Sequence, residues 1–236
     1  HSFPTRRSSD LVIQHGMQAI SGAIDRITIN VHNGNCTCSI IGQEKDSSVK
    51  PSGLCGSGVV SAVAELLRAG FILPDGRLDK TKEIPLIRPG ENGIAEYVLV
   101  PAEKSAAGRK ITLTQKDIRA VQLAKGAFRT GIDILCAKAG LSRPRKLIIA
   151  GAFGNYIDKR DALDIGMFPE IPESDISQAG NAAGEGAVLA LFNPKLLEQA
   201  TRLARKNKVV DLSSQPEFQN TFVNSLAFPE IVNPKK

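Results

Sequence analysis

The sequence has no tryptophan and only two tyrosines among its 236 residues. Proteins that hold single-stranded nucleic acids stack the bases on aromatic side chains, so such a platform is disfavoured here. The net charge of +6 is spread along the chain instead of gathered in one basic patch, which argues in the same direction. No apolar run approaches the roughly 20 residues that a membrane span requires. We therefore expect neither a nucleic acid nor a membrane as a partner.

Cysteine is also scarce, with four residues in the whole chain: Cys36, Cys38, Cys55 and Cys136. This density excludes a disulfide scaffold, and a reducing, cytoplasmic location fits best. Cys36 and Cys38 lie two residues apart on an expected strand and would face the same side. A zinc site would need a second cysteine pair, which the sequence lacks. We expect these two cysteines to be buried as small apolar side chains and expect no metal site.

The first eleven residues, HSFPTRRSSDL, do not read like the rest of the chain. They resemble the translation of a sequencing-adapter oligonucleotide and lack the apolar core of a secretory signal. We expect residues 1–11 to be an artefact, residues 12–229 to form one lobe that is incomplete at its N-terminus, and residues 230–236 to be a loose tail. An incomplete sheet leaves an unpaired strand edge, so the isolated chain is expected to be poorly soluble or oligomeric.

Alternating patterns predict two pairs of strands. Apolar and polar residues alternate over 23–31 and over 36–41, on either side of an Asn-Gly turn at 33–34. An Asn-Gly pair between two such runs predicts a β-hairpin. A second pair of strands is expected at 97–100 and 110–113, joined by a polar connection.

Helical periodicity is clearest in the middle of the chain. Thr114, with an acidic residue at Asp117, is typical of a helix N-cap and opens the longest expected helix, about 115–139. Other expected elements are helices at 59–69, 161–166, 180–191 and 196–206 and a short strand at 209–212. Helices that are interspersed with strands along the chain predict an α/β fold.

The stretch from 147 to 155 carries the strongest functional signal. Four consecutive apolar residues at 147–150 predict a strand buried on both faces of a covered sheet. Open α/β sheets bind ligands beyond the carboxyl ends of their strands, and glycine lets a ligand approach the backbone. A tight turn without a ligand explains the pattern equally well. The small-residue loop that follows the strand consists of Gly151, Ala152, Phe153, Gly154 and Asn155.

A second glycine-rich loop, Gly56-Ser57-Gly58, leads into the helix that stops at Gly70. Free N–H groups and the positive end of the helix dipole make such a helix start a candidate phosphate site. The loop fits neither the P-loop nor the dinucleotide pattern, because no Gly-Lys-Ser/Thr follows and Ser61 stands where a third glycine belongs. A purely structural turn is the alternative.

A polar stripe on the longest helix is the third candidate. Gln122, Lys125 and Arg129 are spaced so that they share one face. We expect Lys125 to face the ligand cleft or a partner lobe. A solvated edge without a function would produce the same pattern.

Six segments together resemble one protein family. In chain order they are 16–29, 53–70, 111–135, 147–158, 180–191 and 212–229, the fourth reading LIIAGAFGNYID. They are similar to the C-terminal ATPase domain of the reductive activators of corrinoid proteins, which belong to the acetate and sugar kinase/Hsp70/actin superfamily. The resemblance implies an α/β (α+β mixed sheet) fold, as an actin-like or ribonuclease H-like ATPase lobe.

The resemblance also implies a function. Residues 151–155 match the adenosine motif of the superfamily, and residues 180–191 match its second connecting helix, on which two lobes hinge. ATP with Mg²⁺ would drive an electron from a [2Fe–2S] ferredoxin-like domain, absent from this chain, to the Co(II) of a corrinoid protein, restoring Co(I). The two phosphate-binding hairpins of the superfamily are absent as well, so the chain alone is not expected to hydrolyse ATP. A homodimer is compatible with this assignment.

Two other functions remain open from the sequence. A lobe of a small-molecule kinase would share the fold, although no set of polar substrate residues stands out. A non-enzymatic interaction module would keep the lobe and lose the nucleotide. A cysteine-rich ferredoxin segment upstream would favour the activator, and a second kinase-type lobe without that segment would favour the kinase.

Overall fold

The structure is a computed structural model that describes residues 13–82, 84–90, 93–151, 154 and 156–231. Within these ranges the strands form two three-stranded sheets and one two-stranded sheet, with helices on and between them. This is the mixed α/β architecture that the sequence predicts. Among the described helices, none combines the length and apolar character that crossing a membrane requires.

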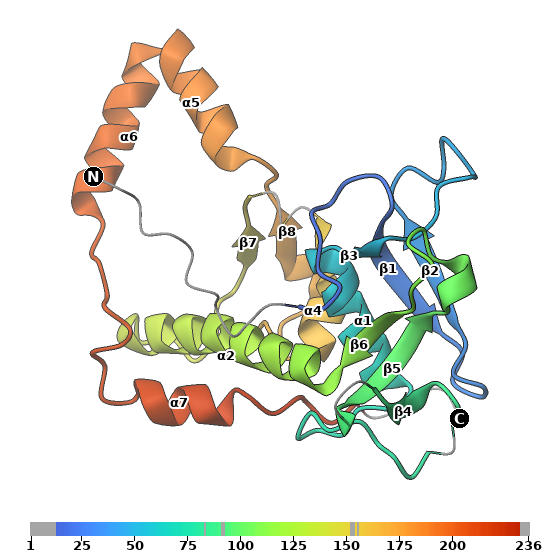
Figure 1. Cartoon of the computed structure of the whole chain (residues 1–236). Helices are drawn as coiled ribbons and strands as arrows, with labels where there is room; N and C mark the ends of the chain where they lie inside the picture. Colours follow the sequence, from blue (N-terminus) through green and yellow to red (C-terminus); the bar gives the residue numbers. More distant parts are fainter. Residues whose placement is uncertain (1–12, 83, 91–92, 152–153, 155, 232–236) are drawn as a thin grey trace, which may run out of the picture.

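The first sheet has the strand order β2-β1-β3 and carries one helix, α1, against its central strand (Figure 1). β1 and β2 are antiparallel, with Ile29 opposite Cys36, which confirms the predicted hairpin. β1 and β3 are parallel. The elements are β1 (Ala23–Ile29), β2 (Cys36–Ile40), β3 (Gly53–Leu54) and α1 (Gly56–Arg68).

The second sheet has the order β4-β5-β6, and both of its strand pairs are antiparallel. The pairing of β5 with β6 confirms the predicted second strand pair. Tyr97 of β5 is fully buried and stacks on Phe71, whose ring centroid is 6.1 Å away. Buried residues of both sheets, such as Ile27 of β1 and Tyr97 of β5, belong to one hydrophobic core. The elements are β4 (Ile87–Pro89), β5 (Ala95–Val100), the short 3₁₀ helix η2 (Ala102–Lys104) and β6 (Ile111–Thr114).

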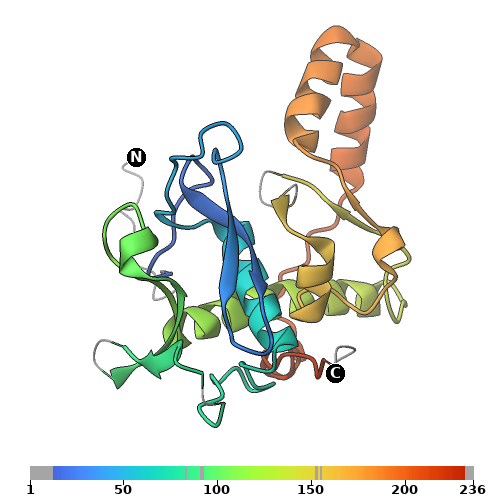
Figure 2. The same cartoon turned by 90° about the vertical axis from the view of Figure 1, so that its right-hand side faces the viewer.

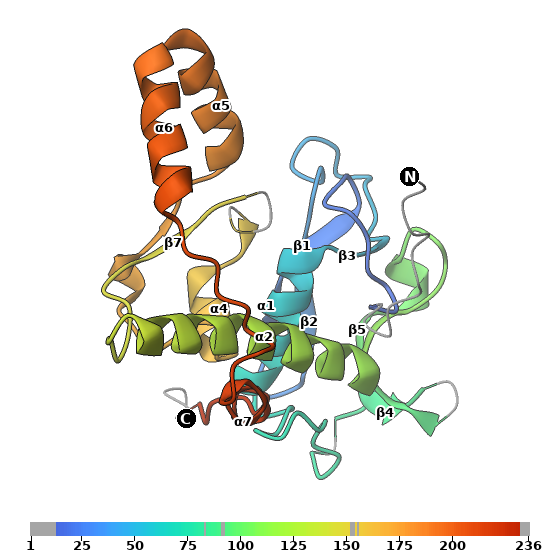
Figure 3. The same cartoon turned by 90° about the vertical axis from the view of Figure 1, so that its left-hand side faces the viewer.

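The longest helix, α2 (Gln115–Lys138), forms where the sequence predicts it. The Thr114 hydroxyl accepts a hydrogen bond from the Asp117 N–H, and the Asp117 carboxylate accepts one from the Thr114 N–H at 2.8 Å. This capping box satisfies backbone donors at the helix start. A further helix, α7 (Phe218–Asn224), packs along α2 (Figures 1 and 3).

The third sheet joins β7 (Leu147–Ile149) to β8 (Ile176–Gln178) in parallel. The expectation that residues 147–150 form a strand buried on both faces is wrong, because Ile148 is 67% exposed. Leu147 and Ile149 pack against the core, whereas the face of β7 that carries Ile148 is open to solvent. A continuous apolar run predicted the strand correctly but could not show what covers it.

Helix α4 (Lys159–Asp164) follows β7 and packs against α1. Arg68, the last residue of α1, donates to Asp161 at 2.5 Å and to Asp164 at 2.7 Å. It also bonds to Glu65 one turn earlier at 2.6 Å. Because all these groups are at least partly buried, the network fixes α4, and the loop that precedes it, relative to α1. The short 3₁₀ helix η3 (Glu173–Asp175) leads into β8.

Two helices, α5 (Ala182–Phe192) and α6 (Pro194–Lys206), form a hairpin that stands away from the other elements in all three views (Figures 1, 2 and 3). No residue of either helix is buried. The strand expected at 209–212 is wrong, since these residues form no strand and Val209 is 97% exposed. Its apolar residues have no neighbouring strand with which to pair.

Candidate functional site

The loop after β7 begins at a residue that requires glycine. Gly151 has φ +98°, a conformation that strongly disfavours residues with a side chain. Its N–H donates to the Gly180 carbonyl at 2.8 Å, which ties the end of β7 to the chain leaving β8. The predicted ligand loop therefore starts with a turn anchored to the neighbouring strand.

Beyond that turn, the described residues Gly154 and Tyr156 are helical, where the sequence predicted a loop. One amide side chain holds this part of the chain. Gln178, the last residue of β8, donates to the carbonyls of Gly154 and Ile157, each at 2.8 Å. A Cβ added to Gly154 would lie 2.2 Å from Cγ2 of Ile149, so only glycine fits against the end of β7. Three further predicted residues, Ala152, Phe153 and Asn155, lie outside the described residues.

The loop ends at Asp158, which connects it to the first sheet. The Asp158 side chain accepts from the Asp161 N–H at 3.0 Å and so caps α4. Its other oxygen pairs with Arg26 of β1 at 2.8 Å. No local pattern in the sequence marks Arg26, Asp158 or Gln178 as part of this site, because their partners are distant in the chain. An Asp three residues before the next acidic residue is, however, a recognisable helix-cap signal.

The second predicted loop lies at the start of α1 and packs against the same strand. The Cys55 N–H donates to the Ile24 carbonyl at 3.1 Å, and the Cys55 thiol donates to that carbonyl at 3.3 Å. A Cβ added to Gly58 would stand 2.0 Å from the same oxygen. Gly58 therefore has a structural task, the close approach of helix and strand. A phosphate contact at Gly56 and Ser57 stays a prediction.

Asp25 of β1 stands between two residues that contact the predicted loops. Ile24 bonds to the loop at the start of α1, and Arg26 pairs with Asp158. One carboxylate oxygen of Asp25, Oδ1, is enclosed and has no hydrogen-bond partner in the described part of the chain. A buried oxygen without a partner is costly unless a ligand, an ion or a water completes it. The sequence does not mark Asp25, because an acidic residue on an alternating strand has the pattern of an ordinary solvent-facing residue.

Lys125 lies elsewhere. Its ammonium donates to the carbonyl of Ala227 and stands 5.2 Å from the centroid of the Phe228 ring. Gln122, on the same face of α2, donates to the Leu226 carbonyl at 3.1 Å. Gln122 and Lys125 thus hold the C-terminal segment, whereas Arg129 bonds to Asp133 and to the Phe168 carbonyl. The structure does not bring Lys125 into contact with either glycine-rich segment. It does line a hollow of about 440 Å³ with Arg129 and other residues of α2 and that segment.

An iron–sulfur cluster does not fit this chain. Cys36 and Cys38 lie together on β2, whereas Cys55 is buried at the start of α1 and Cys136 is on α2. Four thiolates must converge on such a cluster, and these do not. Among the described residues no group of three or more His, Cys, Asp or Glu side chains is placed to hold a metal ion. Mg²⁺ needs fewer protein ligands, since it keeps waters and binds substrate phosphates.

Comparison with known families decides the assignment of the fold. Residues 11–234 match the family model described as the C-terminal domain of RACo, the ASKHA domain. The chain belongs to this family. The resemblance stated from the six sequence segments is confirmed, and so is the expected ATPase-type lobe.

Individual relatives agree with the family. The chain is 36% identical over 225 residues to the corrinoid activation enzyme RamQ of Eubacterium limosum, covering 92% of this chain and 37% of RamQ. It is 26% identical over 197 residues to the [Co(II) methylated amine-specific corrinoid protein] reductase of Methanosarcina barkeri, covering 79% of this chain and 31% of that protein. The chain therefore spans about a third of the length of these relatives.

A solved structure shows the same fold. A reductive activator for a corrinoid, iron-sulfur protein superposes with a TM-score of 0.81 at 35% sequence identity. The match covers 92% of this chain and 34% of that structure. The overall fold described above is thus the fold of a family domain.

Proposed function

We propose that this chain is the nucleotide-binding part of an ATP-dependent reductive activator, which returns corrinoid proteins from Co(II) to Co(I). The observation that carries the proposal is the segment that begins at Gly151 and ends at Asp158, since it follows a parallel strand and each of these two residues is bound to a neighbouring element. Such a loop lies where α/β proteins bind nucleotides. The names of the relatives supply the corrinoid protein as the partner class.

The two loops would receive different parts of ATP. Residues 151–155 would contact the adenosine, because a Cβ placed at Gly151 would meet nothing within 4 Å and glycine lets a flat ligand approach the backbone. The N–H groups at Gly56 and Ser57, at the positive end of the α1 dipole, would face the phosphates. Both loops bond to β1, so a movement of one is transmitted to the other. In this proposal β1 is the element that couples the two halves of the site.

Asp25 is the residue we assign to the Mg²⁺ that accompanies ATP. Its enclosed oxygen has no hydrogen-bond partner among the described residues, and a carboxylate is the ligand type that Mg²⁺ prefers. Asp25 would hold the ion directly or through one of its waters. The bound ion would neutralise phosphate charge while the terminal phosphoryl group of ATP is transferred to water.

ATP binding would promote the electron transfer by changing the conformation of the protein. The electron would come from a [2Fe–2S] domain elsewhere in the activator, since the cysteines of this chain do not converge. The network of Arg68 with Asp161 and Asp164 would carry motion of the loop into α1. Location in the cytoplasm and a homodimeric state complete the proposal.

The test is the substitution Gly154→Val in a fusion that places the N-terminal two thirds of RamQ before residue 13. Its side chain would collide with Ile149 and displace the loop. We expect the affinity for Mg²⁺-ATP, measured by calorimetry, to fall at least about tenfold, or 1.4 kcal/mol. Gly186→Ala is the matched control, because a Cβ added there meets nothing within 4 Å.

A folded Gly154→Val fusion with unchanged ATP affinity would contradict the proposal. The double variant Gly154→Ala with Ile149→Ala separates the two reasons for the loss. Restored binding would show that Gly154 serves packing against β7, and binding that stays lost would show that the nucleotide itself lies against Gly154.

A further inference from the structure

Two thiols lie close together outside the nucleotide site. Cys36 and Cys38 are on β2, the edge strand of the first sheet, and their side chains point to the same face. Their Sγ atoms are 3.6 Å apart. Both residues are half-buried against the core, so the pair is neither sealed off nor fully in solvent.

The polar groups around the pair are occupied by other partners. Glu65 of α1 accepts from the Ile29 N–H at 2.8 Å and bonds to Arg68 at 2.6 Å. The Tyr97 hydroxyl donates to the Gly34 carbonyl. The hydrogen bond that the structure shows for each thiol is with the other thiol, and neither takes part in the proposed function.

We propose that Cys36 and Cys38 form a two-thiolate site for a soft metal ion of the d¹⁰ class, such as Cu⁺ or Cd²⁺. Thiolates select soft ions. The thiolate bonds of the d¹⁰ ion Zn²⁺, about 2.3 Å long, place two sulfurs of a tetrahedral site roughly 3.8 Å apart. The observed 3.6 Å separation therefore requires a small opening of the pair, which is larger for Cd²⁺ because its bonds to sulfur are longer. This goes beyond the expectation from the sequence that the two are only buried small side chains.

The site supplies two ligands from the protein. Among the described residues no third His, Cys, Asp or Glu joins the pair. A structural zinc site uses four protein ligands, so a permanent zinc staple is not what these thiols build. The remaining positions would be taken by water or by a small thiol from solution, which makes the ion exchangeable.

Cadmium is the probe for the first test, because its bonds to thiolates absorb in the ultraviolet. The reduced 236-residue chain is expected to bind one Cd²⁺. Cys36→Ser and Cys38→Ser should each weaken binding by roughly a hundredfold or more, since loss of even an outer-shell partner costs 10–100-fold. Cys136→Ser is the matched control and should bind as the unaltered chain does.

A second test uses the unaltered chain, so it does not depend on the folding of a variant. Phenylarsine oxide condenses with two neighbouring thiols to form two As–S bonds and release one water, without any change of oxidation state. Trypsin should yield the adduct on the peptide 27–45, which contains both cysteines. Cadmium binding that survives in the double serine variant, or an adduct on the peptides of Cys55 or Cys136, would overturn the proposal.

Discussion

Lys125 carries an ammonium group into the interior, where it is only 1% exposed. Burial and the neighbouring Arg129 guanidinium lower the pKa of Lys125 to about 8 from the usual 10.5. The Ala227 carbonyl and the Phe228 ring compensate in part for the lost hydration. A buried cation that is held mainly by a carbonyl and a ring makes the attachment of the C-terminal segment sensitive to pH.

The pH dependence of stability that Lys125 causes has the opposite sign to that of a lysine in an ion pair. Between about pH 8 and pH 10.5 the unfolded chain binds more protons at Lys125 than the folded chain does. The contribution of Lys125 to the stability must therefore rise with pH in this window. Below pH 8 the full cost of burying the charge is present, and it amounts to about 3 kcal/mol at most.

We predict that Lys125→Met removes this dependence. The free energy of unfolding, measured in urea, should increase for the unaltered chain relative to the variant as the pH rises from 8 to 10.5. Lys138→Met, at the exposed end of the same helix, is the control and should show no such relative gain. Parallel curves for Lys125→Met and the unaltered chain would contradict the assignment of the effect to this ammonium.

At the scale of elements, the contact between α1 and β1 explains why a glycine stands inside a helix. Gly58 is buried, and a Cβ there would meet the Ile24 carbonyl oxygen at 2.0 Å. In an exposed helix the change from glycine to alanine gains up to about 1 kcal/mol. Here the helix would have to move away from the backbone of the strand, so the sign reverses.

We predict that Gly58→Ala destabilises the chain by about 1–3 kcal/mol or more, as overpacking typically does. The urea midpoint should fall without a change in slope. Gly186→Ala, in the open helix α5, should leave the midpoint unchanged or raise it slightly. A Gly58→Ala chain as stable as the unaltered one would show that α1 is free to shift on the sheet.

Local signals sufficed for the elements whose causes are local. The Asn-Gly turn predicted the hairpin of β1 and β2, and the Thr114 cap predicted where α2 begins. The apolar run at 147–150 predicted a strand, but its burial depends on neighbours that the run itself does not specify. The apolar residues at 209–212 failed for the same reason, since a strand needs a partner.

The candidate site divides in a similar way. Glycines mark a loop in any sequence, so Gly151 and Gly154 were found without a structure. Arg26 and Gln178 fix that loop from β1 and β8, and no spacing in the sequence relates them to it. For Lys125 the sequence predicted the helix face on which the residue lies. It did not predict that the C-terminal segment packs against that face.

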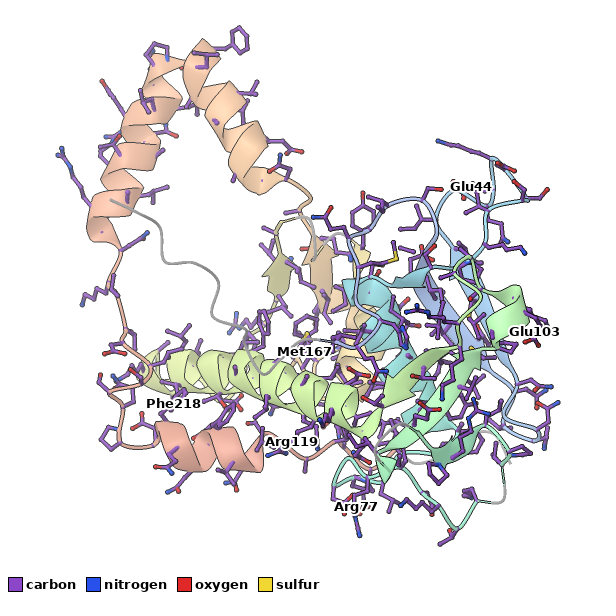
Figure 4. The ribbon with its side chains drawn as sticks, viewed as in Figure 1. Glu44, Arg77, Glu103, Arg119, Met167 and Phe218 are labelled. Atoms are coloured by element: carbon purple, nitrogen blue, oxygen red, sulfur yellow. The ribbon has the colours of Figure 1, made fainter. Side chains whose placement is uncertain are left out.

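At the scale of the whole molecule, the hairpin of α5 and α6 is the feature that most needs an explanation. The two helices pack mainly on each other, and their side chains project on both sides (Figure 4). Leu191 and Phe192, at the tip, are 78% and 80% exposed. Apolar side chains gathered on an exposed element mark an interface or an aggregation site. The exposed strand β7, with Ile148 in solvent, adds a second such surface.

We predict that the 236-residue chain self-associates through this hairpin. Burying a leucine or phenylalanine side chain contributes about 1.5–3 kcal/mol, so the double variant Leu191→Gln with Phe192→Gln should weaken association at least about tenfold, or 1.4 kcal/mol. Sedimentation velocity over a range of concentrations measures this change. The control pair is Lys195→Gln with Glu198→Gln, two exposed residues of α6, which should associate as the unaltered chain does. A chain that stays monomeric over the same range, or association that the apolar substitutions leave intact, would place the contact elsewhere, with the open face of β7 as the next surface to alter.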